Sequence, residues 1–312
     1  YETAVKMAER LFPNGLQVKD NYKNVVIASG DSYPDALTAT TTAYNYNAPL
    51  LLTQKGQLPK DTAEYLKKVN PSRIVIVGGT QTINEAVEKE LEAFGKIKRI
   101  SGLNRYGTSV ENAKDLLRWI MDNNETKWVH GHFGDKGIVY LASGENFPDA
   151  LAAASPAAVA GSPLLLTMKN QLPKEVKDFI IANKAKEVRV IGGTGSVSDA
   201  VIRELRDSNL TANRIAGLDR SATSVEIAKE FYPNANHVFV TSGAGYADAL
   251  TGATLAAKEG SPVLLLPNAD TVSDAVKAYL ETYDVTSFTI LGGTGTVSEK
   301  ARTEINNIIL GR

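Results

Sequence analysis

The sequence SGDSYPDALTA, from Ser29 to Ala39, indicates the architecture of the chain because it occurs three times. It returns as SGENFPDALAA from Ser143 to Ala153 and as SGAGYADALTG from Ser242 to Gly252. The carboxylates that the copies share are 114 and 99 residues apart and fall on Asp35, Asp149 and Asp248. A period of about 100 residues has the size of a small domain. The repeat therefore predicts a tandem array of similar units.

Three further motifs follow in the same order. The first is a leucine run at Ala48–Thr53, Ser162–Thr167 and Ser261–Pro267, and the second is a Gly-Gly-Thr turn that begins at Gly78, Gly192 and Gly292. The third, GLNRYGTSVENAK at Gly102–Lys114, recurs as GLDRSATSVEIAK at Gly217–Lys229, and the opening YETAVKMAE matches its interior. We therefore predict three units: unit 1 (residues 1–103), unit 2 (104–217) and unit 3 (218–312).

Each unit is predicted to be a small α/β sandwich. Short apolar runs at residues 24–28, 49–53 and 73–77 alternate with amphipathic segments, which is typical of a parallel sheet covered by helices on both faces. Lys96–Ile100 is expected to add an edge strand. Pro34 and Pro148 suit a first helical turn, and Thr82 with Glu85 has the spacing of a capping box.

The composition excludes several classes of protein. The 34 basic and 35 acidic residues give a net charge of −1, so no global basic field favours nucleic acid. No apolar run is long enough for membrane insertion, and a chain without cysteine has neither disulfides nor thiolate metal sites. His130 and His132 lie in an insertion, residues 130–137, that we interpret as an exposed loop. We expect no cofactor and no metal.

The repeated aspartates have two interpretations. Near the start of a helix, a carboxylate is stabilised by free N–H groups and by the helix dipole. Catalysis would need a second recurrent group, but only an aromatic residue recurs beside the aspartates, as Tyr33, Phe147 and Tyr246. We favour a structural role and a protein that is not an enzyme. The Gly-Gly-Thr turns are likewise interpreted as tight turns, with weak phosphate binding as the alternative.

Charge differs between the units. Unit 1 has 13 basic and 11 acidic residues, unit 2 has 14 and 13, and unit 3 has 7 and 11. An anionic polymer should therefore bind mainly to units 1 and 2. Arg105 and Arg220 could either pair with the repeated aspartates or face such a ligand. The basic candidates for polymer binding are Lys55, Arg73, Arg99, Arg105, Lys169, Arg189, Arg214 and Arg220.

The motifs SGxxxPDAL, PLLL, GGTxxVS and GxxR, in this order, resemble the cell wall binding repeat type 2 domains of clostridial and bacillar surface proteins. The resemblance covers essentially the whole chain. It implies three Toprim-like or Rossmann-like α/β units packed as a triangular pseudo-trimer. It also implies a non-catalytic, extracellular module that holds a surface protein to the cell wall or S-layer of a Gram-positive bacterium. The ligand would be an anionic, phosphate-bearing polysaccharide comparable to teichoic acid.

The family's Pro-Ile-Leu-Leu motif, which is connected with polymer binding, falls on equivalent positions of each unit. In units 1 and 2 these are Pro49, Leu50, Leu51, Leu52, Pro163, Leu164, Leu165 and Leu166. Unit 3 has Pro262–Leu265, and it departs from the other units at Ser221, Ala247 and Pro267. These changes and its excess of acidic residues make unit 3 the one expected to be structural.

Two alternatives to anchoring remain open. A lattice-forming structural module would contact other S-layer or cell wall proteins and would carry a contiguous apolar patch outside its cores. A phosphate-handling enzyme could use an aspartate beside a glycine-rich turn to hold Mg²⁺, but it lacks a second carboxylate at metal-ligand spacing.

Overall fold

The computed structural model describes residues 1–19, 21–122 and 137–311. Unit 1 contains α1 (Glu2–Leu11), β1 (Val18–Lys19), β2 (Tyr22–Ser29), α2 (Tyr33–Asn45), β3 (Leu50–Thr53), α3 (Lys60–Val69), β4 (Arg73–Val77), α4 (Glu85–Leu91) and β5 (Lys96–Ile100). Unit 2 contains α5 (Arg105–Asp122), β6 (Ile138–Ser143), α6 (Pro148–Val159), β7 (Leu164–Thr167), α7 (Lys174–Ala182), β8 (Glu187–Ile191), α8 (Asp199–Asp207) and β9 (Thr211–Ile215). Unit 3 contains α9 (Arg220–Phe231), β10 (His237–Ser242), α10 (Ala247–Lys258), β11 (Val263–Leu266), α11 (Asp274–Thr282), β12 (Ser287–Ile290) and α12 (Glu299–Leu310).

The three sheets are built in the same way. The strands run parallel in the orders β3-β2-β4-β5, β7-β6-β8-β9 and β11-β10-β12. The predicted edge strand is confirmed, because β5 pairs with β4 with Ile74 opposite Ile97. Unit 1 adds the short β1, which pairs antiparallel with β2. The repeat did not predict β1, because units 2 and 3 have no copy of its sequence.

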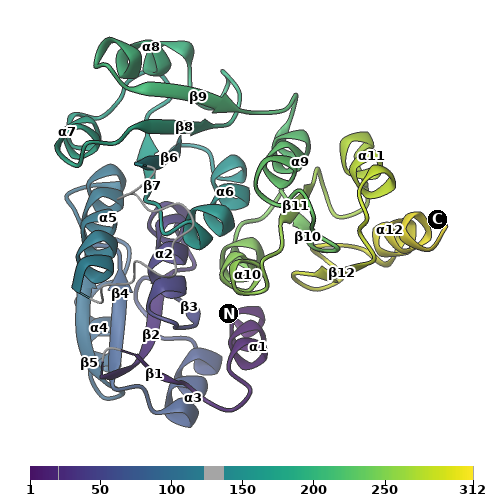
Figure 1. Ribbon diagram of the computed structural model, residues 1–312. Coiled ribbons are helices and arrows are strands. Elements are labelled where there is room, and N and C mark those ends of the chain that lie inside the picture. The colour runs from purple at the N-terminus through teal and green to yellow at the C-terminus, as the bar shows by residue number, and fades with distance from the viewer. Residues whose placement is uncertain (20, 123–136, 312) are drawn as a thin grey trace.

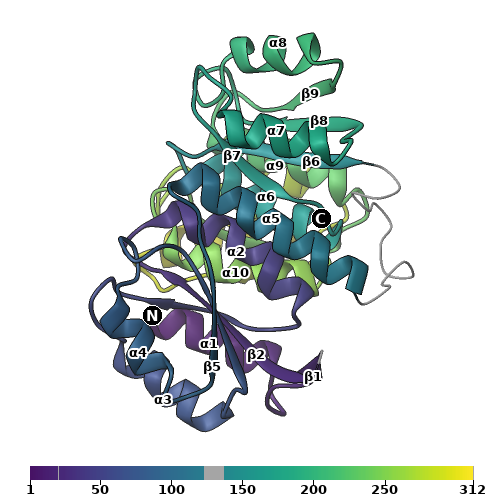
Figure 2. The ribbon, with the colours of Figure 1, turned by 90° about the vertical axis from the view of Figure 1, so that its left-hand side faces the viewer.

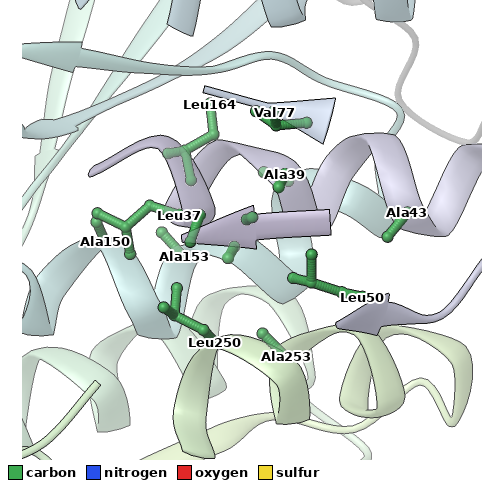
Figure 3. Packing of buried hydrophobic residues seen from close by; sticks show 14 of the residues in the cluster. Leu37, Ala39, Ala43, Leu50, Val77, Ala150, Ala153, Leu164, Leu250 and Ala253 are labelled. Atoms are coloured by element: carbon green, nitrogen blue, oxygen red, sulfur yellow. The ribbon is translucent and has the colours of Figure 1, made fainter. Parts of the chain in front are cut away.

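The helices that begin at the repeated aspartates form the centre of the molecule. α2, α6 and α10 contact one another and cross its middle (Figure 2). They are rich in alanine and threonine, and α6 is buried from Pro148 to Ala158. Small side chains let the three helix axes approach closely, so Leu37, Ala150, Ala153 and Leu250 gather between them (Figure 3).

The first helix of each unit links it to the preceding unit. α5 packs on α2 and on β7, and α9 packs on α6 and on β11. α1 packs on α10 and on β3, so the three units close into a ring (Figure 1). This arrangement is the expected triangular pseudo-trimer. Because α5 and α9 contact two units each, the limits 1–103, 104–217 and 218–312 stay predictions.

The structure gives one finding on membranes. Across residues 1–19, 21–122 and 137–311, no helix combines the length and the apolar character needed to cross a bilayer. The insertion with His130 and His132 lies outside the described residues.

Candidate functional site

The repeated aspartates join two motifs of their own unit. Asp35 accepts a hydrogen bond from the Thr82 hydroxyl at 3.1 Å. In the other units, Asp149 accepts from Ser196 and Asp248 from Thr296, both at 2.7 Å. Each bond ties the start of a central helix to the residues after a Gly-Gly-Thr turn.

The predicted capping box at Thr82 and Glu85 is wrong. Asn84 is the residue that caps α4, because its side chain accepts a hydrogen bond from the Val87 N–H at 3.0 Å. Thr82 lies two residues before this cap, and its hydroxyl is within donating distance of Asp35 and of the Gly79 carbonyl.

The glycine turns close around these carboxylates. Gly78, Gly192 and Gly292 have φ angles of +131°, +101° and +107°. A Cβ atom on Gly192 would lie 2.3 Å from Asp149 Oδ2. Burial raises the pKa of Asp35, although hydrogen bonds from Thr82 and Thr108 and the charge of Arg105 lower it in part. This geometry is that of a tight turn held by a buried carboxylate.

The repeated aromatic residues meet where the three units converge. The ring centroids of Tyr33, Phe147 and Tyr246 lie 5.3 to 5.6 Å apart, and Tyr246 donates a hydrogen bond to the Gly30 carbonyl at 3.0 Å. They pack on one another at the start of the central helices rather than flanking a reactive group. In the part of the chain that the structure describes, no three metal-ligating side chains cluster.

Four of the predicted basic residues donate hydrogen bonds to backbone carbonyls. Arg105 donates to the Gly144 carbonyl and Arg220 donates to the Gly243 carbonyl. Arg99 and Arg214 donate to the carbonyls of the glycine turns and pair with Glu88 and Asp199. The charge of Arg105 also acts on Asp35 of the neighbouring unit. These contacts hold units and turns together, and polymer contact by these four residues stays a prediction.

The remaining predicted residues have different surroundings. The leucines of the two PLLL motifs are at most 3% exposed and form core strands with Pro49 and Pro163 before them. Lys55 and Lys169 are exposed, and their backbone N–H groups donate to the carboxylates of Asp31 and Glu145. Arg189 pairs with Glu187 and Glu230 and stacks on the Phe231 ring. Their contact with polymer stays a prediction.

Arg73 lies in a different place, beside a hollow at the amino ends of the strands. The hollow holds about 300 Å³ and lies between unit 1 and α5. A second hollow of about 380 Å³ shares Trp119 with it and reaches the C-terminal ends of α2, α6 and α10. We call the two hollows together the basic groove. Its charged and aromatic lining residues are Lys19, Tyr44, Tyr46, Arg73, Lys98, Asp115, Arg118, Trp119, Asp122 and Lys258.

The cations of the basic groove are held against aromatic rings. The Arg73 guanidinium lies 4.2 Å from the Tyr22 ring centroid and 4.8 Å from that of Tyr46. Its Nε donates to Asn24 at 2.7 Å, whereas its Nη2 is buried without a hydrogen-bond partner. Lys19 lies 4.7 Å from the Trp119 ring centroid. Contacts between cations and ring faces fix the positions of the charges without neutralising them.

A buried carboxylate anchors Lys98. The Lys98 ammonium contacts Asp115, which is 6% exposed, and donates to the Tyr46 hydroxyl at 2.8 Å. Tyr46 in turn donates to Asp115 at 2.8 Å. This network joins α2, β5 and α5, and it gives the floor of the groove a fixed geometry.

Lys258 reaches the groove from unit 3. Although much of the residue is exposed, its ammonium donates to the Tyr44 carbonyl at 3.1 Å and to Asn47 at 3.0 Å. It also lies 4.4 Å from the Tyr44 ring centroid. Local burial, followed by repulsion from Lys19, lowers the pKa of Lys258 to about 8. The protonation of this group therefore changes near pH 8.

Sequence reasoning identified only Arg73 among the groove residues. Lys19, Tyr44, Tyr46, Lys98, Trp119 and Lys258 were missed, and so was the groove itself. The predictions followed repeated motifs, but the equivalent of Tyr46 in unit 2 is Ala160, and that of Lys258 is Val159. The one signal in the sequence was the basic character of Lys96–Ile100, which contains Lys98.

The recurrent polar groups of the three α/β repeats serve the fold, and the groove combines cations with aromatic rings. These features define a binding module. The model of the cell wall binding domain 2 (CWB2) family matches residues 1–88, 99–202 and 214–302. The chain belongs to this family, whose members are cell wall binding domains, as the repeated motifs implied.

Known proteins agree with this assignment. The chain is 35% identical over 285 residues to the amidase enhancer of Bacillus subtilis, covering 91% of this chain and 37% of that protein. It is 30% identical over 312 residues to the N-acetylmuramoyl-L-alanine amidase LytC of B. subtilis, covering 100% of this chain and 57% of LytC. The chain thus spans from about a third to just over half the length of these relatives.

Solved structures show the same three-repeat fold. Cwp6 from Clostridium difficile superposes with a TM-score of 0.83 at 26% identity, covering 98% of this chain and 45% of Cwp6. Cwp8 from C. difficile superposes with a TM-score of 0.82 at 26% identity, covering 99% of this chain and 50% of Cwp8.

Proposed function

We propose that this chain is a non-catalytic module that anchors a surface protein to the cell wall of a Gram-positive bacterium by binding an anionic, phosphate-bearing polysaccharide. We further propose that the polymer lies in the basic groove. The observation that carries the proposal is the gathering of Lys19, Arg73, Lys98, Arg118 and Lys258 in one groove, on a chain whose net charge is −1.

The groove has the chemistry that a phosphate-bearing glycan requires. Arginine and lysine donate charge-assisted hydrogen bonds to phosphate oxygens. Flat aromatic surfaces such as Trp119 and Tyr44 suit the apolar faces of sugar rings, since they have an apolar body beside polar groups. A groove shared by several units also suits an extended polymer better than a small ligand.

The relatives support a transferable binding module. One is named as an amidase and the other as an amidase enhancer, and both are longer than the region they share with this chain. A region common to proteins with different activities is more simply explained by a shared binding role than by a shared reaction. The internal use of Asp35, Asp149 and Asp248 supports the same conclusion.

Cosedimentation with Gram-positive cell walls tests the function. Native walls are compared with walls from which acid has removed the phosphate-linked polymer, across a salt series. We expect binding to native walls that is lost on stripping and weakens with salt, because salt screens exposed charges. Equal binding to both wall preparations would contradict the proposal.

A pair of matched variants tests the groove. The double variant Lys19→Gln/Arg118→Gln removes two groove cations, and Lys60→Gln/Lys174→Gln removes two exposed cations from α3 and α7. We expect the first to weaken wall binding roughly tenfold, from the loss of two phosphate contacts, and the second to bind like the parent chain. Equal effects of the two variants would exclude the basic groove as the binding site, but they would not contradict the proposal that the chain binds the wall.

A further inference from the structure

Unit 3 has an open sheet edge where units 1 and 2 have a fourth strand. β5 pairs with β4 and β9 pairs with β8, whereas among the described residues β12 pairs only with β10. Phe288 and Ile290 of β12 are half-buried, while their counterparts Ile74 and Ile76 in β4 are fully buried. A groove of about 660 Å³ lies along this edge. We call it the edge groove, and it is lined by Phe288, Ile290, Gly292, Val297, Glu299 and Arg302 among others.

In unit 1 the equivalent sheet edge is occupied by β5, which shows the contacts that a strand makes there. The Ile100 carbonyl accepts a hydrogen bond from the Gly78 N–H at 2.9 Å. Arg99 donates to the Gly78 carbonyl at 2.7 Å and pairs with Glu88 at 2.8 Å. Unit 2 repeats the pattern with Ile215, Gly192, Arg214 and Asp199. An occupant therefore needs a parallel backbone, an apolar last residue and an arginine before it.

The edge groove presents the matching groups. Gly292 has the same position in the Gly-Gly-Thr motif as Gly78 and Gly192 and a similar positive φ angle. Glu299 begins α12 as Asp199 begins α8. It forms an exposed pair with Arg302 at 3.5 Å, and such a surface pair is weak and easily exchanged. A carboxylate and a glycine turn are thus placed to receive an arginine.

The path of the chain identifies the occupant. β5 leads through four residues into α5, and β9 leads through four residues into α9. α1 has the equivalent place, packed on α10 and on β3. β5 and β9 also follow α4 and α8, so the corresponding strand of unit 3 lies between α12 and α1 in the ring, where it can lead into α1.

We propose that the edge groove binds a parallel strand of the Lys96–Ile100 type, with arginine in its fourth position, that runs into the N-terminus of α1. This strand would complete the third sheet by β-strand addition, and its backbone hydrogen bonds to β12 would tie unit 3 to α1. The competing occupant is a second copy of the chain, because open edge strands pair with other chains.

A fusion protein tests the proposal. The sequence KIKRISGLNR, copied from Lys96–Arg105, is placed directly before Tyr1, and a scrambled sequence of the same composition serves as the control. We expect amide exchange at Ser287–Ile290 to slow at least tenfold in the first fusion and to stay unchanged in the scrambled one. Glu299→Gln in the first fusion should lose part of this protection, because it removes the partner of the incoming arginine.

Two results would overturn the proposal. One is equal amide exchange at β12 in both fusions. The other is protection of β12 in the unfused chain that rises with protein concentration together with dimer formation, which would assign the edge groove to a second copy.

Discussion

At the scale of single residues, repeated and unrepeated side chains have different tasks. Asp149 and Arg220 recur and satisfy backbone and hydroxyl groups inside the ring. Trp119 and Lys258 do not recur and line the basic groove. Repetition in this chain therefore marks what every unit needs in order to fold. We therefore expect the residues that bind a specific ligand to be among those that differ between the units.

Lys258 gives polymer binding a pH dependence. Its pKa of about 8 means that raising the pH from 6 to 9 removes its charge, so we expect wall binding to weaken several-fold with a midpoint near pH 8. Lys258→Arg should flatten the profile, since arginine stays charged throughout this range. Cosedimentation at fixed ionic strength measures both profiles.

Unfolding would not explain such a loss of binding. A lysine whose pKa is lowered by folding binds fewer protons in the native chain than in the unfolded one between about pH 8 and its ordinary value. Its own contribution to stability therefore rises with pH in this window. If wall binding has the same pH profile in the parent chain and in Lys258→Arg, Lys258 does not take part in binding.

At the scale of elements, the strand-to-helix turns are the most constrained parts of each unit. In unit 2 the turn after β8 must pass the carboxylate at the start of α6, and only a glycine leaves space for it. The central helices are similarly constrained, because they are buried on nearly every side by small residues. Their sequences are recognisable as helices, but their complete burial depends on the other two units.

A pair of adjacent glycines tests this constraint. Gly192→Ala places a Cβ 2.3 Å from Asp149 Oδ2 at a φ angle of +101°. We expect the free energy of unfolding to fall by about 2–4 kcal/mol, through backbone strain and the displaced carboxylate. Gly193→Ala is the control, since nothing lies within 4 Å of the position that its methyl group would take. Urea unfolding measures both, and equal midpoints would show that the turn tolerates a side chain.

At the scale of the whole molecule, the three units form one closed ring. A single hydrophobic cluster includes core residues of unit 1 and unit 2 and extends into α10 of unit 3. The ring closes between α1 and unit 3, where Arg10 pairs with Glu259 at 2.8 Å and stacks on Phe239. The second hollow of the basic groove depends on this closed ring, because α2, α5, α6 and α10 all contribute to it.

An isolated unit is therefore expected not to fold. Residues 104–217 alone would expose α6 to water on the faces that α2, α9 and α10 cover. We expect this fragment to lack the cooperative thermal transition, followed by circular dichroism, that the complete chain should show. A sharp transition of the fragment, with native-like helix content, would show that each unit is an independent domain.

The number of repeats, the parallel α/β units and the edge strand at Lys96–Ile100 can be predicted from the sequence alone, and the repeated motifs resemble those of a cell wall binding family. The structural features follow from periodicity, turn residues and local hydrophobic pattern, which act over short stretches of chain. The sequence did not reveal that Thr82 serves Asp35 instead of its own helix, or that Tyr46, Lys98 and Asp115 form one network. These contacts and the groove depend on the tertiary fold, because they join residues tens to hundreds of positions apart. Such residues come into contact only when the central helices pack against one another, and no local sequence pattern predicts that packing.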